Sequence, residues 1–205
     1  PDLWLLALAL GLLNACRYGF LDWGLTHFKE MQGAGVGQAA LNYAILPVGG
    51  IAGAYVAGWA TDRFFASRRA PVISMLLVAL GGLTILYEWV ARVSLAWTVV
   101  VLLLVGFAIY GPQVLLVGTA PADLARRGTA AAAAGLVNFV GYMGAYAGAQ
   151  LTGAFVDQHG WRVAVFSWAG CAFAAAAAVA LLWNETARAS NVAPIGATSA
   201  PEARQ

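Results

Sequence analysis

Arg17 lies inside an otherwise apolar stretch of the sequence, and its chemistry is the most informative in the chain. The other ten of the eleven Lys and Arg residues fall between the apolar stretches or in the C-terminal tail. An arginine near the centre of a bilayer is costly, so such residues usually face a protein interior or a water-filled cavity. A guanidinium binds phosphate through two parallel hydrogen bonds, which lysine cannot reproduce. Arg17 is therefore a candidate for an anion site.

A structural ion pair with Asp22, five residues further along the chain, is the alternative for Arg17. Side chains that are roughly three or four residues apart are neighbours on a helix surface, and a separation of five is a poor match to that spacing. The spacing thus favours the anion site.

Other polar side chains at a comparable depth are expected to line one cavity with Arg17. They are Asn14, Tyr110, Asn138, Tyr142 and Tyr146. Asn14 precedes Arg17 by about one helical turn, and the last three recur at every fourth position, so they share one stripe of a helix. For a single tyrosine the alternative is helix packing, because a buried hydroxyl needs a hydrogen-bond partner. Their convergence favours a cavity near the membrane midplane, where transporters bind substrates.

The composition places these residues in a membrane protein that crosses the bilayer several times. The chain has 205 residues, of which 61% are hydrophobic and 10% charged, and its mean hydropathy is +0.76. Soluble domains carry about 25% charged residues. The net charge of +2 is too small and too scattered for a nucleic-acid partner. The expected fold class is an all-α membrane protein in contact with the lipid bilayer.

Six stretches reach the length of about 20 apolar residues that a membrane-spanning helix needs. They cover about 3–27, 38–60, 71–90, 96–119, 129–156 and 163–183. The predicted domain is residues 1–186, and residues 187–205 form a polar tail rich in Ala, Pro and Ser that we expect to be disordered. Pro47 and Pro112 are expected to kink or break their helices. The Gly49/Gly53 and Gly144/Gly148 pairs indicate close helix packing, although such pairs are common in a glycine-rich chain.

The distribution of arginine predicts the orientation of the chain. One side of the predicted bundle carries Arg63, Arg68, Arg69, Arg126, Arg127, Arg188 and Arg204, whereas the other carries Lys29, Arg92 and Arg162. The positive-inside rule places the first group in the cytoplasm. We therefore expect a multi-pass protein of a bacterial inner membrane with both ends of this chain cytoplasmic.

Few residues suggest enzymatic chemistry. Cys16 and Cys171 lie in separate apolar stretches and are interpreted as small core residues, not as a disulfide or a metal site. His27 and His159 lie near helix ends and are interpreted as solvated side chains. No pair of a nucleophile and a base stands out, so the prediction is that the protein is not an enzyme.

The segment from Gly58 to Asp62-Arg63, followed by Arg68-Arg69, resembles the cytoplasmic loop signature of the major facilitator superfamily. Further runs resemble the organophosphate:phosphate antiporters of that superfamily, over about residues 3–183. These runs are Arg17 to Trp23 with Lys29-Glu30, Tyr110 to Gln113, Gly128 to Ala130 with Gly135 and Gly141-Tyr142, and Asp157 with Gly160-Trp161. The resemblance implies that the six helices are the C-terminal half of a twelve-helix fold.

The resemblance also implies roles for individual residues. Arg17 would be one of two arginines that bind phosphate, one from each half, and Tyr110 and Tyr142 would line the cavity, with Asn14 and Asn138 as further candidates. Asp22 would pair with a basic residue of the other half, while Asp62, Arg63, Arg68 and Arg69 would form the cytoplasmic conformational motif. The implied function is exchange of glycerol-3-phosphate or a sugar phosphate for inorganic phosphate by alternating access, without a cofactor.

Departures from the family pattern leave the substrate open. Pro47, Thr119 and Asn14 stand where members carry a Glu, a His and a Tyr. The missing N-terminal half admits three explanations: a fragment of a longer chain, which a start at Pro1 favours; one half of a split transporter; or a homodimer of halves. Two alternative functions also remain, namely a membrane sensor of a sugar phosphate with the same fold and a nonfunctional fragment.

Overall fold

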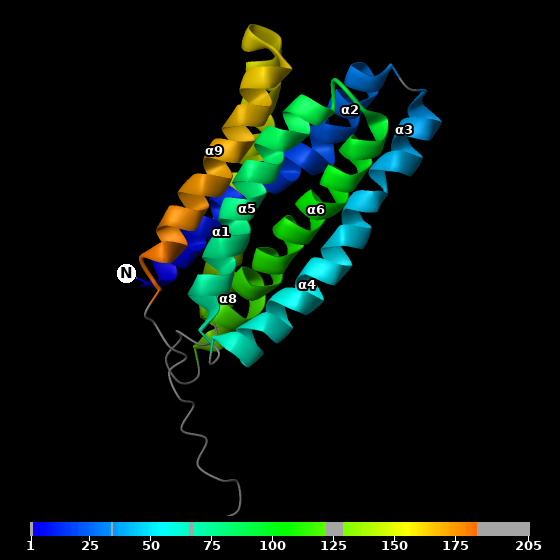
Figure 1. Cartoon of the computed structure of the whole chain (residues 1–205). Helices are drawn as coiled ribbons and strands as arrows, with labels where there is room; N and C mark the ends of the chain where they lie inside the picture. The colour runs from blue at the N-terminus through cyan, green and yellow to red at the C-terminus, as the bar shows by residue number, and fades with distance from the viewer. Residues whose placement is uncertain (1, 34, 66–67, 122–128, 184–205) are drawn as a thin grey trace, which may run out of the picture.

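In the part of the chain that the structure describes, the helices form a tilted bundle with six candidate membrane spans (Figure 1). The computed structural model describes residues 2–33, 35–65, 68–121 and 129–183, and no strand occurs in these ranges. Three spans are built from consecutive segments: α1 (Asp2–Tyr18), the π-helical η1 (Gly19–Trp23) and α2 (Gly24–Gln32); α3 (Val36–Tyr43) and α4 (Ile45–Phe64); and α6 (Leu95–Val114) with the π-helical η2 (Leu115–Thr119). The other three are α5 (Arg69–Val90), α8 (Ala130–His159) and α9 (Trp161–Ala180).

The all-helical architecture with six spans is as the hydropathy pattern predicts. The first span continues to Gln32, beyond its predicted end at His27, and the last one begins at Trp161. The tail at 187–205 lies outside the described residues, as do Arg126, Arg127, Arg188 and Arg204.

Both prolines lie close to an interruption of regular α-helix. Pro47 has no N–H to donate to the carbonyl oxygen of Tyr43, and the α-helix is interrupted at Ala44, between α3 and α4. Pro112 lies inside α6, and the helix changes to π geometry at Leu115. The sequence predicts a kink or break at each proline, and the structure has an interruption of regular α-helix in the second span and a π-helical segment in the fourth.

Glycines allow two pairs of helices to approach closely. A Cβ atom on Gly49 would lie 1.9 Å from the carbonyl oxygen of Leu103, so α4 and α6 are in backbone contact there. A Cβ on Gly144 would lie 2.2 Å from the carbonyl oxygen of Gly11, where α8 crosses α1. Gly53 and Gly148 make similarly close approaches. Both glycine pairs therefore lie at helix crossings, as small residues do in membrane bundles.

The remaining packing leaves two helices largely uncovered. α5 packs against α6 and α9, and α1 packs against α8 and α9. Only 28% of the apolar window of the α3–α4 span and 22% of that of α8 is buried, against 50–56% for the other spans. The start of α1, the end of α9 and the α4–α5 connection lie at one end of the bundle (Figure 1). α2 and α3 lie at the opposite end.

Candidate anion site and polar clusters

Arg17 lies in the last turn of α1, and its guanidinium lies over two aromatic rings. Its carbon is 5.1 Å from the ring centre of Tyr18 and 5.2 Å from that of Tyr110, which belongs to α6. These are distances at which a cation is attracted to the negative face of a ring. Arg17 forms no ion pair within the described ranges, so no carboxylate of these residues occupies the hydrogen-bonding edge of its guanidinium.

The π-helical segment η1 begins two residues after Arg17 and is held by aromatic packing. A Cβ on Gly19 would lie 2.4 Å from Cε2 of Trp168, so a glycine is required where α9 presses against the first span. The Phe20 ring packs on Trp168 with ring centres 5.0 Å apart. The Tyr43 hydroxyl donates to the Phe20 carbonyl oxygen at 2.6 Å. Because π-helical bulges frequently occur at functional sites, this packing supports a positioning role for η1 beside Arg17.

Tyr110 is placed by a glycine of the neighbouring helix. A Cβ on Gly50 of α4 would lie 2.5 Å from Cδ2 of Tyr110, so the absence of a side chain there makes room for the ring. The interruption between α3 and α4 at Ala44 lies somewhat less than two helical turns before this contact. Three different spans thus determine how Arg17 and Tyr110 meet.

Three buried polar atoms around this pair have no hydrogen-bond partner in the described part of the chain: Asn14 Oδ1, Arg17 Nε and Gln113 Oε1. Buried polar atoms are nearly always paired, so unpaired ones need an explanation. Gln113 follows Tyr110 by three residues and was not selected as a site residue from the sequence. The available signal was its spacing from Tyr110, which places the two on adjacent positions of one helix surface.

The predicted stripe on α8 is present but faces outward. The Asn138 side-chain amide donates to the carbonyl oxygen of Ala134 at 3.0 Å, within its own helix. The side chains of Tyr142 and Tyr146 are 61% and 66% exposed. Among the described residues, only the rings of Tyr18 and Tyr110 lie within cation–π distance of Arg17. The structure therefore unites Arg17 with Tyr110 and leaves Tyr142 on the uncovered face of α8.

Asp22 lies in η1 with an exposed side chain. It forms no ion pair with Arg17 in the described ranges. The poor helix spacing between the two residues is consistent with this outcome.

The arginine-rich connection between α4 and α5 contains an ion pair. Arg69 Nη1 lies 3.1 Å from Oδ1 of Asp62, and Asp62 is the more exposed of the two side chains. Arg63 is exposed and Arg68 is half-buried. The acidic residue of the motif is thus bound to an arginine at the start of the next span.

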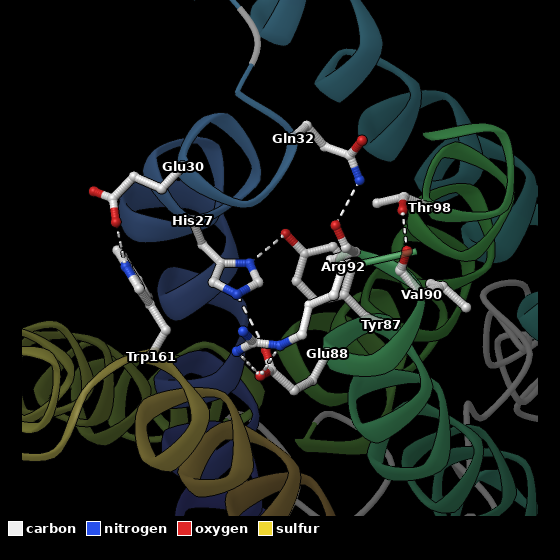
Figure 2. Close-up of polar contacts among 10 residues, drawn as sticks. His27, Glu30, Gln32, Tyr87, Glu88, Val90, Arg92, Thr98 and Trp161 are labelled. Carbon is white, nitrogen blue, oxygen red and sulfur yellow. Dashed lines mark hydrogen bonds and ion pairs between the residues drawn. The ribbon is translucent and has the colours of Figure 1, made fainter. Parts of the chain in front are cut away.

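A buried polar cluster at the opposite end of the bundle joins α2 to α5 (Figure 2). His27 is fully buried, and its Nδ1 lies 3.0 Å from the Tyr87 hydroxyl while its Nε2 lies 3.1 Å from Oε2 of Glu88. Arg92 donates to Oε1 of Glu88 from Nε at 3.0 Å and also from Nη2. The interpretation of His27 as a solvated side chain is wrong, because α2 continues past it and packs it against α5. His159, by contrast, is exposed.

Glu88 was not identified from the sequence. It is 2% exposed, although it lies near the end of an apolar span where a carboxylate could have reached water. The available signal was Arg92, four residues later, since this spacing supports ion pairs on helices. The partner that explains the burial, His27, belongs to a different span and could not be read from local spacing.

The sequence comparisons agree on one protein family. A family model described as Major Facilitator Superfamily matches residues 3–204. The chain is 35% identical to the "Glycerol-3-phosphate transporter" of Bacillus subtilis (strain 168), over 93% of this chain and 43% of that protein. It is 30% identical to the "Probable hexose phosphate transport protein" of Chlamydia pneumoniae, over 90% of this chain and 40% of that protein.

A protein with a different kind of activity is similar as well. The chain is 31% identical to the "Membrane sensor protein UhpC" of Salmonella typhimurium, over 71% of this chain and 33% of that protein. The chain therefore spans less than half the length of these curated relatives.

Proposed function

The chain belongs to the Major Facilitator Superfamily, and on that premise we propose that it is the C-terminal six-helix half of a phosphate-ester transporter. The whole protein would exchange an organic phosphate, such as glycerol-3-phosphate or a sugar phosphate, for inorganic phosphate. This is transport without covalent chemistry, so no enzymatic step is proposed.

The observation that carries the proposal is the environment of Arg17. Its guanidinium lies inside a membrane span, within cation–π distance of the rings of Tyr18 and Tyr110, and it has no carboxylate partner among the described residues. An unneutralised arginine at this depth is expensive unless it serves a function. Phosphate is the anion whose geometry a guanidinium matches best. The printed names of two relatives, a glycerol-3-phosphate and a hexose phosphate transporter, agree with this ligand class.

The uncovered faces of α4 and α8 support the assignment of the chain to one half. A buried fraction of 22–28% leaves room for a second group of helices against these two spans. In the proposed whole protein, a second arginine from the N-terminal half would face Arg17 across the cavity. Asn14, Tyr110, Asn138 and Tyr142 would contribute the rest of this side. The two halves would rock about the central site, as in other transporters of this architecture.

Two further groups have proposed roles in that motion. Asp22, exposed beside the site, would pair with a basic residue of the N-terminal half. Asp62, with Arg63, Arg68 and Arg69, would stabilise one conformation at the end of the bundle that holds the α4–α5 connection. The arginines at this end favour a cytoplasmic position under the positive-inside rule, and both ends of this chain would then lie on that side of an inner membrane.

Counterflow in proteoliposomes tests the proposal. The whole protein that contains this chain is reconstituted with inorganic phosphate inside the vesicles, and labelled glycerol-3-phosphate or glucose-6-phosphate is added outside. We expect uptake of at least one ester, dependent on the internal phosphate. An uptake rate that is the same with and without internal phosphate would overturn the exchange mechanism. If no phosphate ester enters the vesicles or binds the protein, the assignment of phosphate esters as the ligand class would be overturned.

A sensor is the second candidate function, and the similarity to a membrane sensor protein favours its consideration. A sensor would bind the ester with the same residues but would not release it on the other side. Ester binding by calorimetry without counterflow supports the sensor. The third alternative, a nonfunctional fragment, is supported if the 205-residue chain alone binds no phosphate ester by calorimetry while the whole protein does.

A further inference from the structure

A small cavity lies where α5 ends and α9 begins, at the opposite end of the bundle from the α4–α5 connection. Its volume is about 220 Å³, and it is lined by Glu88, Trp89, Arg92 and Arg162. None of these residues belongs to the site around Arg17. Two of the four lining side chains are arginines, which is a high density of positive charge for a protein in which 10% of all residues are charged.

Arg162 enters the cavity with its guanidinium fixed by aromatic rings. The guanidinium carbon lies 5.1 Å from the ring centre of Trp89 and 5.7 Å from that of Phe166. In the part of the chain that the structure describes, Arg162 has no carboxylate within ion-pair distance. Stacking leaves the N–H groups at the edge of the guanidinium available for an anionic acceptor.

Arg92 is oriented by the buried cluster that Figure 2 shows. Its Nε and Nη2 both donate to Oε1 of Glu88, and Oε2 of the same carboxylate accepts from His27. His27 in turn contacts the Tyr87 hydroxyl at 3.0 Å, and both of these side chains are fully buried. A surface arginine is usually mobile, but this one is anchored through three successive side chains. Such support is what a preorganised binding site requires.

The charges of the cavity fit a monoanion. Two guanidinium groups and one carboxylate give a formal charge of +1, and both carboxylate oxygens already accept hydrogen bonds from His27 and Arg92. Arg92 has a further nitrogen, Nη1, that the contact with Glu88 does not use. A phosphodiester carries one negative charge and offers acceptor oxygens to both arginines.

The surroundings of the cavity belong to the membrane interface. The span formed by α5 ends at Val90 and that formed by α9 begins at Trp161, so the cavity lies at the level where two spans leave the hydrocarbon region. The Trp89 side chain is 56% exposed and that of Phe166 is 39% exposed. Exposed aromatic rings at this level are typical of residues that contact lipid headgroups and the adjoining acyl chains.

We propose that the cavity formed by Glu88, Trp89, Arg92 and Arg162 binds the phosphodiester headgroup of a membrane phospholipid. The phosphate lies between the guanidinium groups of Arg92 and Arg162, while the first part of the acyl chains packs on Trp89 and Phe166. This site does not depend on the transport function proposed above, and its loss leaves the Arg17 site intact.

Native mass spectrometry of the purified whole protein tests the site, with phosphatidylglycerol as the probe. Diacylglycerol provides the lipid control, because it has the same acyl chains but no phosphate. R162Q removes one guanidinium without touching the buried cluster, so the variant is expected to fold. K29Q is the matched protein control, since it removes one exposed positive charge from the same end of the bundle but outside the cavity.

We expect R162Q to weaken the binding of phosphatidylglycerol about tenfold, in keeping with the loss of a charge-assisted contact, and K29Q to leave it unchanged. Diacylglycerol should bind alike to all three proteins. Equal affinity of wild type and R162Q for phosphatidylglycerol would overturn the site. Displacement of the lipid by inorganic phosphate would show that a free anion occupies the cavity and would overturn the lipid assignment.

Discussion

The guanidinium carbon of Arg17 lies 5.2 Å from the ring centre of Tyr110, and this contact joins the first span to the fourth. The contact sets the cation over an electron-rich ring face, and the buried Nε of Arg17 has no hydrogen-bond partner in the described part of the chain. An arginine that served only to stabilise the bundle would be expected beside a carboxylate. The arrangement is instead that expected of an anion-binding residue. Substitutions of Arg17 and Tyr110 should therefore affect transport.

Replacing Arg17 with lysine should abolish counterflow. Lysine keeps the charge but presents a compact ammonium that cannot form two parallel hydrogen bonds to phosphate or stack between Tyr18 and Tyr110. Loss of one hydrogen bond to a charged group costs about 1.5–3 kcal/mol, so ester affinity should fall at least about tenfold. Initial counterflow rates and calorimetric binding measure the effect. Near-normal uptake by R17K would contradict the role of Arg17.

Tyr110 should contribute mainly through its aromatic face. We expect Y110F to retain ester binding better than Y110A, since phenylalanine preserves the ring over Arg17 and its packing against Gly50. A cation–π contact contributes about 0.5–2 kcal/mol, so Y110A should lose roughly 2- to 30-fold in affinity. If Y110F is as impaired as Y110A, the hydroxyl rather than the ring face is the important group.

The sequence predicted the bundle well because the evidence for it is local. Each span is a continuous apolar stretch, and the glycine pairs at Gly49 and Gly144 already indicated where backbones approach. Arg17 could likewise be selected from its own span, because a charge inside an apolar stretch is conspicuous. Its pairing with Tyr110 depends on how two distant spans pack, and the sequence supported it only through shared depth.

The sequence failed where a polar side chain is explained by a partner on another span. His27 lies near the predicted end of its helix, so a solvated position was the reasonable interpretation. The structure extends that helix to Gln32 and places His27 against Glu88 and Tyr87 of α5. Gln113 and its unpaired Oε1 were overlooked for the same reason, since its surroundings come from several spans.

The crossing of α4 and α6 should not tolerate a side chain at Gly49. A Cβ there would lie 1.9 Å from the Leu103 carbonyl oxygen, which belongs to a backbone that cannot rotate away. We expect G49A to destabilise the protein by about 1–3 kcal/mol, the usual cost of overpacking. Thermal unfolding in detergent measures the difference.

Gly82 supplies the control for that substitution. It is an exposed residue of α5, and a Cβ there would have no atom of a neighbouring helix within 4 Å in the described part of the chain. G82A therefore adds a methyl group to open space. Alanine is a better helix former than glycine, and G82A should be neutral or stabilising by up to about 1 kcal/mol. Equal losses in both variants would show that the close approach at Gly49 is not what limits stability.

The buried cluster around His27 should stabilise the end of the bundle where α2 meets α5. A carboxylate only accepts hydrogen bonds, so His27 donates to Glu88 from Nε2, and the Tyr87 hydroxyl can then donate to Nδ1. H27A leaves the Tyr87 hydroxyl and one Glu88 oxygen without these partners at buried positions. Unsatisfied buried groups cost about 1–3 kcal/mol, so the free energy of unfolding should fall by about that amount.

Two control experiments distinguish the effect of breaking this cluster from a general effect of replacing a histidine. H159A removes an exposed side chain, and its effect should stay within about 0.5 kcal/mol, as is usual for surface substitutions. A double-mutant cycle between H27A and E88A should show a coupling energy, because the two side chains lie 3.1 Å apart. Additive losses in that cycle would mean that His27 and Glu88 stabilise the protein independently. Arg92 would then be oriented by Glu88 alone, and His27 would have no part in preorganising the headgroup cavity.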